Sequence, residues 1–156
     1  MSGPGREGIP DGAAGDSELV DSLPVGVYHT SGAGRILRAN PEMAAMFGYG
    51  HPDELLNVRA TDLYVHPEDA AELRRELEET DVVSQRTREM RRRDGTRIWV
   101  EESVRAIRDS RGGLAGLRGI LQDVTDARRA RRDLARSEAM HRSLFQNAGD
   151  ALFVME

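Results

Sequence analysis

The residues best suited to chemistry in this 156-residue chain are a few carboxylates, histidines and aromatic rings. Cysteine is absent, which excludes disulfides, thiolate metal sites, iron–sulfur clusters and cysteine nucleophiles. The histidines are scattered without metal-ligand spacing. They are His29, His51, His66 and His141. No Ser/His/Asp order, carboxylate pair or phosphate-binding loop has a persuasive setting, so the sequence predicts neither a catalytic nor a metal site.

Glu102 is the least expected residue of the sequence. Four apolar residues recur around it at period two, which predicts one apolar face of a strand with Glu102 on that face. They are Ile98, Val100, Val104 and Ala106. Burying an unpaired carboxylate is costly. We therefore expect an ion pair with an arginine or partial exposure on a dimer face, with contact to a polar ligand as the other alternative.

Three side chains could contact a ring-shaped cofactor. Tyr28 and Trp99 could stack on a flavin, although such residues more often pack in a core or on a sheet face. His66 could ligate haem iron, although its position directly before Pro67 favours a structural role at a helix start. We expect no cofactor, and a haem or flavin stays open as the alternative.

The pattern of apolar residues and turn signals predicts an α+β fold. The predicted strands span residues 25–30, 35–39, 82–92, 96–108 and 114–122. Asn40 caps a first helix with Pro41 in its first turn, and Pro67 opens a longer helix to about Glu79. Asp94-Gly95 is a two-residue hairpin signal. This order predicts a five-stranded antiparallel sheet with helices on one face.

The two ends of the chain lie outside this sheet. Residues 1–15 are rich in glycine and predict a flexible, disordered tail, and residues 16–23 predict a short entry helix. Residues 127–143 predict a C-terminal linker helix with a weak heptad-like seam. That seam consists of Ala127, Ala130, Leu134, Ser137, His141 and Leu144. Residues 144–155 parallel residues 19–30, so we expect residues 144–156 to form a helix end, a polar loop and the first strand of a truncated second repeat.

Charge and hydropathy exclude two classes of partner. The net charge of −5 gives no field that would attract nucleic acid or an anionic membrane. The arginines between residues 86 and 93 are interleaved with acidic residues, which is typical of a solvated face. No apolar run approaches the roughly 20 residues that span a bilayer. We expect a cytoplasmic segment without membrane contact, although a longer parent chain could be anchored elsewhere.

Several phrases of the sequence carry a specific resemblance through their order and spacing. They are Leu37-Arg38-Ala39-Asn40-Pro41, Met46-Phe47-Gly48-Tyr49, His66-Pro67-Glu68-Asp69, Arg92-Arg93-Asp94-Gly95-Thr96-Arg97-Ile98-Trp99-Val100 and Gly119-Ile120-Leu121-Gln122-Asp123-Val124-Thr125-Asp126. Together they resemble a PAS domain over residues 16–126. The segment from Ser137 to Asn147 resembles the opening of the next PAS domain in tandem arrays.

The resemblance implies a non-catalytic sensory or dimerisation module of a bacterial signalling protein. Such a module forms a homodimer and binds a small ligand, or none, between its sheet and helices. It relays a signal to an output domain such as a two-component histidine kinase or a diguanylate cyclase, which would make the parent an enzyme of one of these kinds. The alternative is a haem- or flavin-binding redox or gas sensor. PAS proteins that anchor a flavin adduct or a hydroxycinnamoyl chromophore on cysteine are excluded.

The resemblance also indicates site residues. The ligand pocket is expected at Met43, Met46, Phe47, Leu63, Tyr64, Trp99 and Glu102. Asp123 and Thr125 lie where the last strand becomes the exit helix, and they are expected to relay a movement of the sheet. The plainer interpretation of Asp123 is a helix cap. The sequence identifies neither the ligand, the physiological signal, the output domain nor the geometry of the dimer.

Overall fold

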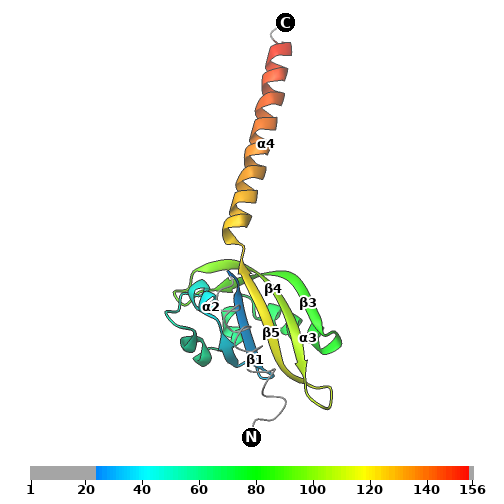
Figure 1. Cartoon of the computed structure of the whole chain (residues 1–156). Helices are drawn as coiled ribbons and strands as arrows, with labels where there is room; N and C mark the ends of the chain where they lie inside the picture. Colours follow the sequence, from blue (N-terminus) through cyan, green and yellow to red (C-terminus); the bar gives the residue numbers. More distant parts are fainter. Residues whose placement is uncertain (1–23, 155–156) are drawn as a thin grey trace. The chain divides into compact units, whose positions relative to one another are not determined.

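The computed structural model describes residues 24–154, with side chains placed as far as residue 147. Its strands are β1 (Gly26–Ser31), β2 (Ile36–Ala39), β3 (Val82–Arg91), β4 (Arg97–Arg108) and β5 (Leu114–Asp123). They form an antiparallel sheet in the order β2-β1-β5-β4-β3 (Figure 1). Every predicted strand agrees with an observed strand to within one residue at each end.

Helical segments connect β2 to β3 and pack on one face of the sheet. They are α2 (Pro41–Met46), the 3-10 helices η1 (Pro52–Asn57) and η2 (Ala60–Leu63), and α3 (Pro67–Glu79). Leu73 and Leu77 of α3 and Met43 of α2 are buried in the core beneath them. The predicted α+β fold, a five-stranded antiparallel sheet with helices and a C-terminal helix, is confirmed.

Asn40 begins α2 and also holds it to the sheet. Its side-chain oxygen accepts hydrogen bonds from the backbone N–H of Met43, at 3.0 Å, and of Val27, at 2.9 Å. Its amide nitrogen donates to the carbonyl of Val25 at 2.8 Å. The cap predicted from the sequence is therefore confirmed, and the same side chain also binds the backbone at the start of β1.

The helix-facing side of the sheet forms the core. Along β4, Ile98, Val100, Glu102 and Val104 are buried, whereas Trp99 lies between them on the other face and is partly exposed. This alternation is the period-two pattern expected of a strand with one buried face.

Tyr28 lies on the same inner face and reaches across the neighbouring strand. The register places Tyr28 of β1 opposite Gly119 of β5. A side chain at Gly119 would collide with the ring of Tyr28, so the glycine leaves the space into which this ring packs.

The turn between β3 and β4 is longer than the sequence predicted. Arg92 N–H donates to the carbonyl of Thr96, and Gly95 N–H donates to the carbonyl of Arg92. The loop therefore has three residues, with Gly95 at a φ of +89°. The two-residue prediction was wrong by one residue, because Asp-Gly also suits a tight turn followed by a left-handed glycine.

The C-terminal helix α4 (Thr125–Val154) forms a unit separate from the sheet unit, with the boundary between Asp123 and Val124. It is helical through Val154, which contradicts the polar loop and strand expected from residue 144 onward. A lone strand would leave its backbone groups unpaired, whereas a helix pairs them within itself. That this segment opens a second domain stays a prediction. Residues 1–23 and 155–156, which include the predicted tail and entry helix, lie outside the described residues.

Candidate functional site

A small cavity lies between the inner face of the sheet and the helices. It is lined by Tyr28, Met43, Ala60, Leu63, Tyr64, Met90, Glu102 and Leu121. Its volume of about 10 Å³ is close to the space that one water molecule occupies. Four of the residues predicted for the pocket line this cavity. They are Met43, Leu63, Tyr64 and Glu102.

The other three predicted pocket residues do not line it. Met46 and Phe47 are buried in the core, with Met46 against β1 near Gly26. Trp99 lies on the opposite face of β4, because neighbouring residues of a strand point to opposite faces. Its assignment to the pocket was therefore wrong.

Sequence reasoning missed several residues of the lining. The sequence indicated Tyr28 only as a possible stacking ring, and it indicated no pocket role for Ala60, Met90 or Leu121. Leu121 and Met90 could have been found from their inward positions on β5 and β3, where each is buried. Ala60 belongs to a 3-10 helix, for which the sequence has no periodic signal.

Glu102 is fully buried, with 0% of its surface exposed. The hydroxyl of Tyr64 donates a hydrogen bond of 2.7 Å to its Oε2. Its Oε1 has no hydrogen bond, and Arg88 Nε lies 3.8 Å away, which is an ion-pair distance but too long for a hydrogen bond. Of the alternatives left open by the sequence, the structure shows the ion pair with an arginine.

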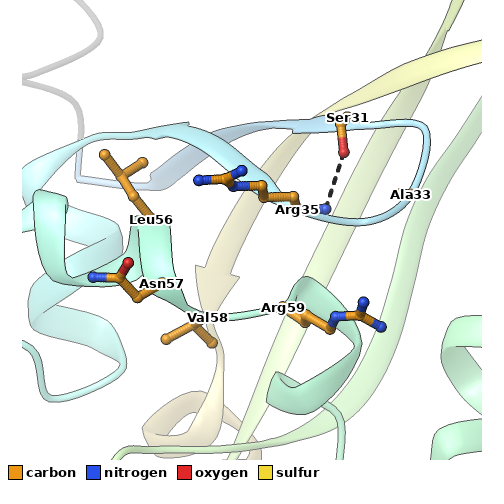
Figure 2. Close-up of a pocket in the computed structure, with 7 residues that line it drawn as sticks. All are labelled: Ser31, Ala33, Arg35, Leu56, Asn57, Val58 and Arg59. Carbon is orange, nitrogen blue, oxygen red and sulfur yellow. Dashed lines mark hydrogen bonds between the residues drawn. The ribbon is translucent and has the colours of Figure 1, made fainter.

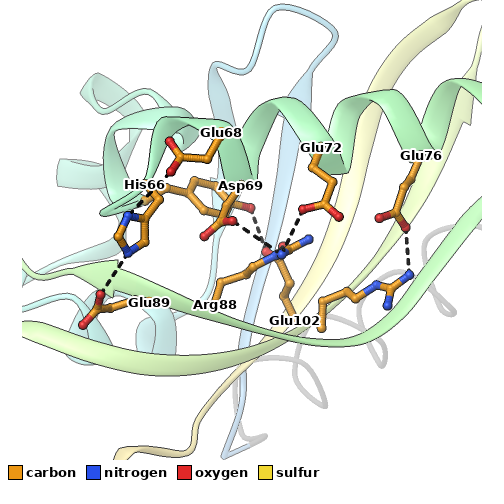
Figure 3. Close-up of polar contacts among 10 residues, drawn as sticks. His66, Glu68, Asp69, Glu72, Glu76, Arg88, Glu89 and Glu102 are labelled. Carbon is orange, nitrogen blue, oxygen red and sulfur yellow. Dashed lines mark hydrogen bonds and ion pairs between the residues drawn. The ribbon is translucent and has the colours of Figure 1, made fainter.

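Arg88 of β3 connects this carboxylate to helix α3. Its Nη1 lies 3.2 Å from Glu72 Oε2 and 3.5 Å from Asp69 Oδ1, and its side chain is only 12% exposed. Figure 3 shows the guanidinium between the carboxylates of α3 on one side and Glu102 on the other. One positive charge is thus shared by three carboxylates.

Burial controls the protonation of this cluster. Desolvation raises the pKa of Glu102 to about 7, although the hydrogen bond from Tyr64 and the charge of Arg88 oppose the rise. Desolvation also raises the pKa of Tyr64 and of Tyr28, and the charge of Glu102 adds to both shifts. Both hydroxyls therefore stay protonated, while Glu102 exchanges a proton near neutral pH.

The junction residues Asp123 and Thr125 occupy the end of β5 and the start of α4. Asp123 lies opposite Val100 in the sheet register, and its carboxylate lies 3.5 Å from the guanidinium of Arg92. Thr125 is buried and is the first residue of α4. Val124 therefore precedes the helix directly, and the ion pair with Arg92 links Asp123 to the end of β3.

The described residues do not fit a haem or a flavin. Pockets for organic ligands usually enclose about 300–1,000 Å³, far more than this cavity. No histidine lines it, and His66 is half exposed at the N-cap of α3, where its Nε2 lies 3.1 Å from Glu89. In the part of the chain that the structure describes, no group of three or more acidic or histidine side chains could hold a metal ion.

A second hollow opens on the surface beside the turn between β1 and β2, with a volume of about 410 Å³. It is lined by Ser31, Ala33, Arg35, Leu56, Asn57, Val58 and Arg59. Figure 2 shows the side chains of Arg35 and Arg59 pointing in different directions. Because its charged groups do not converge, this hollow lacks the arrangement of a specific binding site. No helix among residues 24–154 is long and apolar enough to cross a bilayer.

Comparison with known proteins gives a family match. The family model described as "PAS domain" matches residues 24–126, and no curated protein matches the chain. A PAS domain from Colwellia psychrerythraea is 20% identical, with a TM-score of 0.63, over 73% of this chain and 98% of that chain. A domain of a sensory box sensor histidine kinase/response regulator from Geobacter sulfurreducens is 21% identical, with a TM-score of 0.60, over 72% and 94%.

A third similar structure contains a small molecule. It is the PAS domain of a LuxR-family transcriptional regulator from Burkholderia thailandensis in complex with ethanol. It is 19% identical, with a TM-score of 0.57, and the match covers 69% of this chain and 95% of that chain. At these identities the three structures show a shared fold.

Proposed function

The chain belongs to the PAS domain family, and on that premise we propose that it is a sensory and dimerisation module. In this proposal a change in the core cavity passes to a downstream output domain through the end of β5 and helix α4. One observation carries the proposal: Leu121 lines the cavity, and α4 begins only four residues later at Thr125. A displacement of Leu121 therefore acts on the same short piece of chain that starts the helix.

The ion pair of Asp123 supports a role for this junction. Arg92 is the residue after β3, where the chain begins to turn toward β4. Its contact with Asp123 therefore holds the end of β5 to the start of this turn. We propose Asp123 and Thr125 as the relay residues because they lie at the last position of the strand and the first position of the helix.

The signal that enters the module is proposed to be a small molecule in the cavity. The cavity has apolar walls with a few polar groups, as ligand sites do, and the similar domain from Burkholderia thailandensis holds ethanol. Because the cavity of about 10 Å³ has room for about one water molecule, binding of a larger ligand requires it to enlarge. The proposed output is a histidine kinase or a diguanylate cyclase in a bacterial, cytoplasmic signalling protein. The Geobacter relative, a sensor histidine kinase/response regulator, favours the first. The module itself is proposed to be non-catalytic.

The relay is tested by hydrogen exchange of α4 in two matched variants. Leu121→Val alters the cavity wall next to the junction, and Leu77→Val alters an equally buried position in α3. We expect Leu121→Val, but not Leu77→Val, to change amide exchange in the first turns of α4. In an Asp123→Asn background, the effect of Leu121→Val is expected to shrink.

Two outcomes contradict the relay. If neither variant changes exchange in α4, the cavity and the helix are not coupled. If both variants change it equally, the effect reflects lowered global stability and no specific path through β5. Asp81→Asn is the control for Asp123→Asn, because it also removes an ion pair with an arginine. In that pair, Asp81 lies 3.2 Å from Arg108.

A further inference from the structure

The guanidinium of Arg88 faces α3 with one nitrogen and Glu102 with another. Its Nη1 lies 3.2 Å from Glu72 Oε2 and 3.5 Å from Asp69 Oδ1, both on α3. Its Nε and Nη2 are buried and have no hydrogen-bond acceptor among the described residues. These two nitrogens form the side edge of the guanidinium, which can bind a carboxylate through two parallel hydrogen bonds.

Glu102 lies next to this side edge of Arg88 without bonding to it. Its Oε1 also lacks a hydrogen bond and lies 3.8 Å from Arg88 Nε, about 1 Å beyond the length of a charge-assisted hydrogen bond. Tyr64 holds the other oxygen, Oε2, through its hydrogen bond of 2.7 Å. Buried donors and acceptors in proteins are nearly always paired, so an unbonded pair at this distance needs an explanation. The structure shows Arg88 closer to the carboxylates of α3 than to Glu102.

Arg88 cannot bind Glu102 fully and keep its contacts with α3. Figure 3 shows the carboxylates of α3 on one side of the guanidinium and Glu102 on the other. The guanidinium is planar and rigid, so a movement of about 1 Å toward Glu102 takes Nη1 away from α3 by a similar distance. The helix cannot follow, because Leu73 and Leu77 already bury its inner face in a closely packed core.

We propose that Glu102 and α3 compete for Arg88, and that a proton on Glu102 decides which of them binds it. With the proton present, Glu102 is neutral and Arg88 stays with the carboxylates of α3, as in this structure. Without the proton, the ionised carboxylate attracts the side edge of Arg88, and the attachment of α3 to β3 weakens. The cluster is then a pH-sensitive switch of α3. It goes beyond the proposed sensory function, because the relay through β5 and α4 does not require it.

The surroundings of Glu102 place this change near neutral pH. The titratable or charged groups around it are two tyrosines, one arginine and two carboxylates of α3. They are Tyr28, Tyr64, Arg88, Asp69 and Glu72. The residues that α2 and β5 contribute to the cavity wall are uncharged. Desolvation raises the pKa of Glu102 to about 7, so the carboxylate is mostly neutral at pH 6 and mostly ionised at pH 8.5.

Amide hydrogen exchange at pH 6 and pH 8.5 tests the switch, with rates expressed as protection factors so that the intrinsic pH dependence of exchange cancels. The readout is the protection of α3 relative to β5, because a fall in global stability lowers both alike. We expect the relative protection of α3 to fall by up to about fivefold at pH 8.5, as the loss of a partly exposed ion pair predicts. The Nε–H signal of Arg88, followed by NMR, is expected to titrate over the same range.

Three variants separate the switch from a general weakening of α3. Glu102→Gln keeps the side-chain shape and an acceptor for Tyr64 but cannot ionise, so we expect high relative protection of α3 at both pH values. Arg86→Gln removes the neighbouring ion pair between β3 and α3, in which Arg86 lies 3.1 Å from Glu76. It is expected to lower the protection of α3 at both pH values and to leave the pH-dependent fall unchanged. Glu101→Gln, on the outer face of β4, is expected to behave as the wild type does.

Each contrary result overturns the proposal. If the relative protection of α3 in the wild type is the same at both pH values, there is no switch, and this result decides even if Glu102→Gln folds poorly. The same fall in Glu102→Gln would assign the effect to another group. An Arg88 signal that titrates without a change in α3 would confine the effect to the side chains. The relay test measures α4 in Leu121→Val at one pH, so the relay and the switch fail independently.

Discussion

The carboxylate of Glu102, on β4, contacts Tyr64 after η2 and Arg88 of β3. Tyr64, which follows η2, donates to one oxygen, and Arg88 of β3 lies 3.8 Å from the other. Through Arg88 the carboxylate is connected to Asp69 and Glu72 of α3. The charge of Glu102 therefore acts on the helices as well as on its own strand (Figure 3).

This buried carboxylate predicts a pH dependence of stability. Its pKa rises from the ordinary 4.5 to about 7 in the folded protein. Between these values the folded state keeps a proton that the unfolded state has lost, so the free energy of unfolding falls as pH rises. The contribution is complete below about pH 4.5, is lost as pH rises through 7, and is on the order of 3 kcal/mol. Urea unfolding of the wild type and of Glu102→Gln between pH 5 and 8.5 measures it.

Glu102→Gln is expected to lose this part of the pH dependence, so that its stability relative to the wild type increases as pH rises. Glu101→Gln is the control, because residue 101 is the adjacent carboxylate on the outer face of β4. Parallel stability curves for the wild type and Glu102→Gln would show that residue 102 does not titrate in this range.

The sequence predicted the position of Glu102 but not its partners. Period two alone placed it on the inner face of β4, and the same periodicity should have excluded Trp99 from the pocket. Arg88 could not be identified in advance, because its approach to Glu102 depends on the pairing of β3 with β4 and on a register shift between Val83 and Arg86. Ladder irregularities of this kind depend on tertiary structure and leave no reliable local signal.

Among the elements, α2 depends on a single polar side chain. Asn40 is buried and satisfies the backbone N–H groups of Met43 and Val27. Asn40→Ala leaves two N–H donors and one carbonyl without partners, so we expect a loss of about 2–4 kcal/mol in the free energy of unfolding. Urea denaturation measures it, and Asn57→Ala, at an exposed position, is expected to cost less than about 0.5 kcal/mol. Equal effects of the two changes would contradict the dual role of Asn40.

The packing of β1 on β5 depends on the absence of a side chain at Gly119. Gly119→Ala places a methyl group against the ring of Tyr28, and we expect a loss of about 1–3 kcal/mol. If the collision is the cause, the cost is smaller when Tyr28 is first replaced by leucine. A double-mutant cycle of Gly119→Ala and Tyr28→Leu, measured by thermal unfolding, is expected to show this coupling. Additive effects would point to a backbone cause at Gly119.

Local signals predicted most elements because they act within one segment. Pro41, Pro67 and Asn40 mark helix starts through their own backbone chemistry, and these starts are confirmed. The predicted strand at the C-terminus was wrong because a strand depends on residues outside its own segment. A strand needs a neighbour to pair its backbone, and this chain supplies a continuous helix there instead.

At the scale of the whole molecule, α4 carries large apolar side chains that no other part of the described chain covers. Four large apolar side chains on it are exposed. They are Leu134, Met140, Leu144 and Phe145. In the heptad frame of the predicted seam, Leu134 and Leu144 occupy core positions, and Met140 and Phe145 flank them. An exposed stripe at this spacing is typical of a helix that pairs with a second copy, which is the basis for the proposed homodimer.

Sedimentation equilibrium of a seam variant tests the dimer. Leu134→Gln combined with Leu144→Gln removes two core leucines from each helix, and burial of one leucine contributes about 1.5–3 kcal/mol. We therefore expect at least a hundredfold rise in the dimer dissociation constant, corresponding to about 2.7 kcal/mol or more. Ala135→Gln combined with Ala139→Gln adds the same polar groups on the other side of the helix and is expected to leave association unchanged. A wild type that stays monomeric would contradict the proposed homodimer. Equal association of both double variants would show that α4 does not form the dimer, and the contact would then be sought on the sheet unit, whose outer face exposes Leu37 and Ile120.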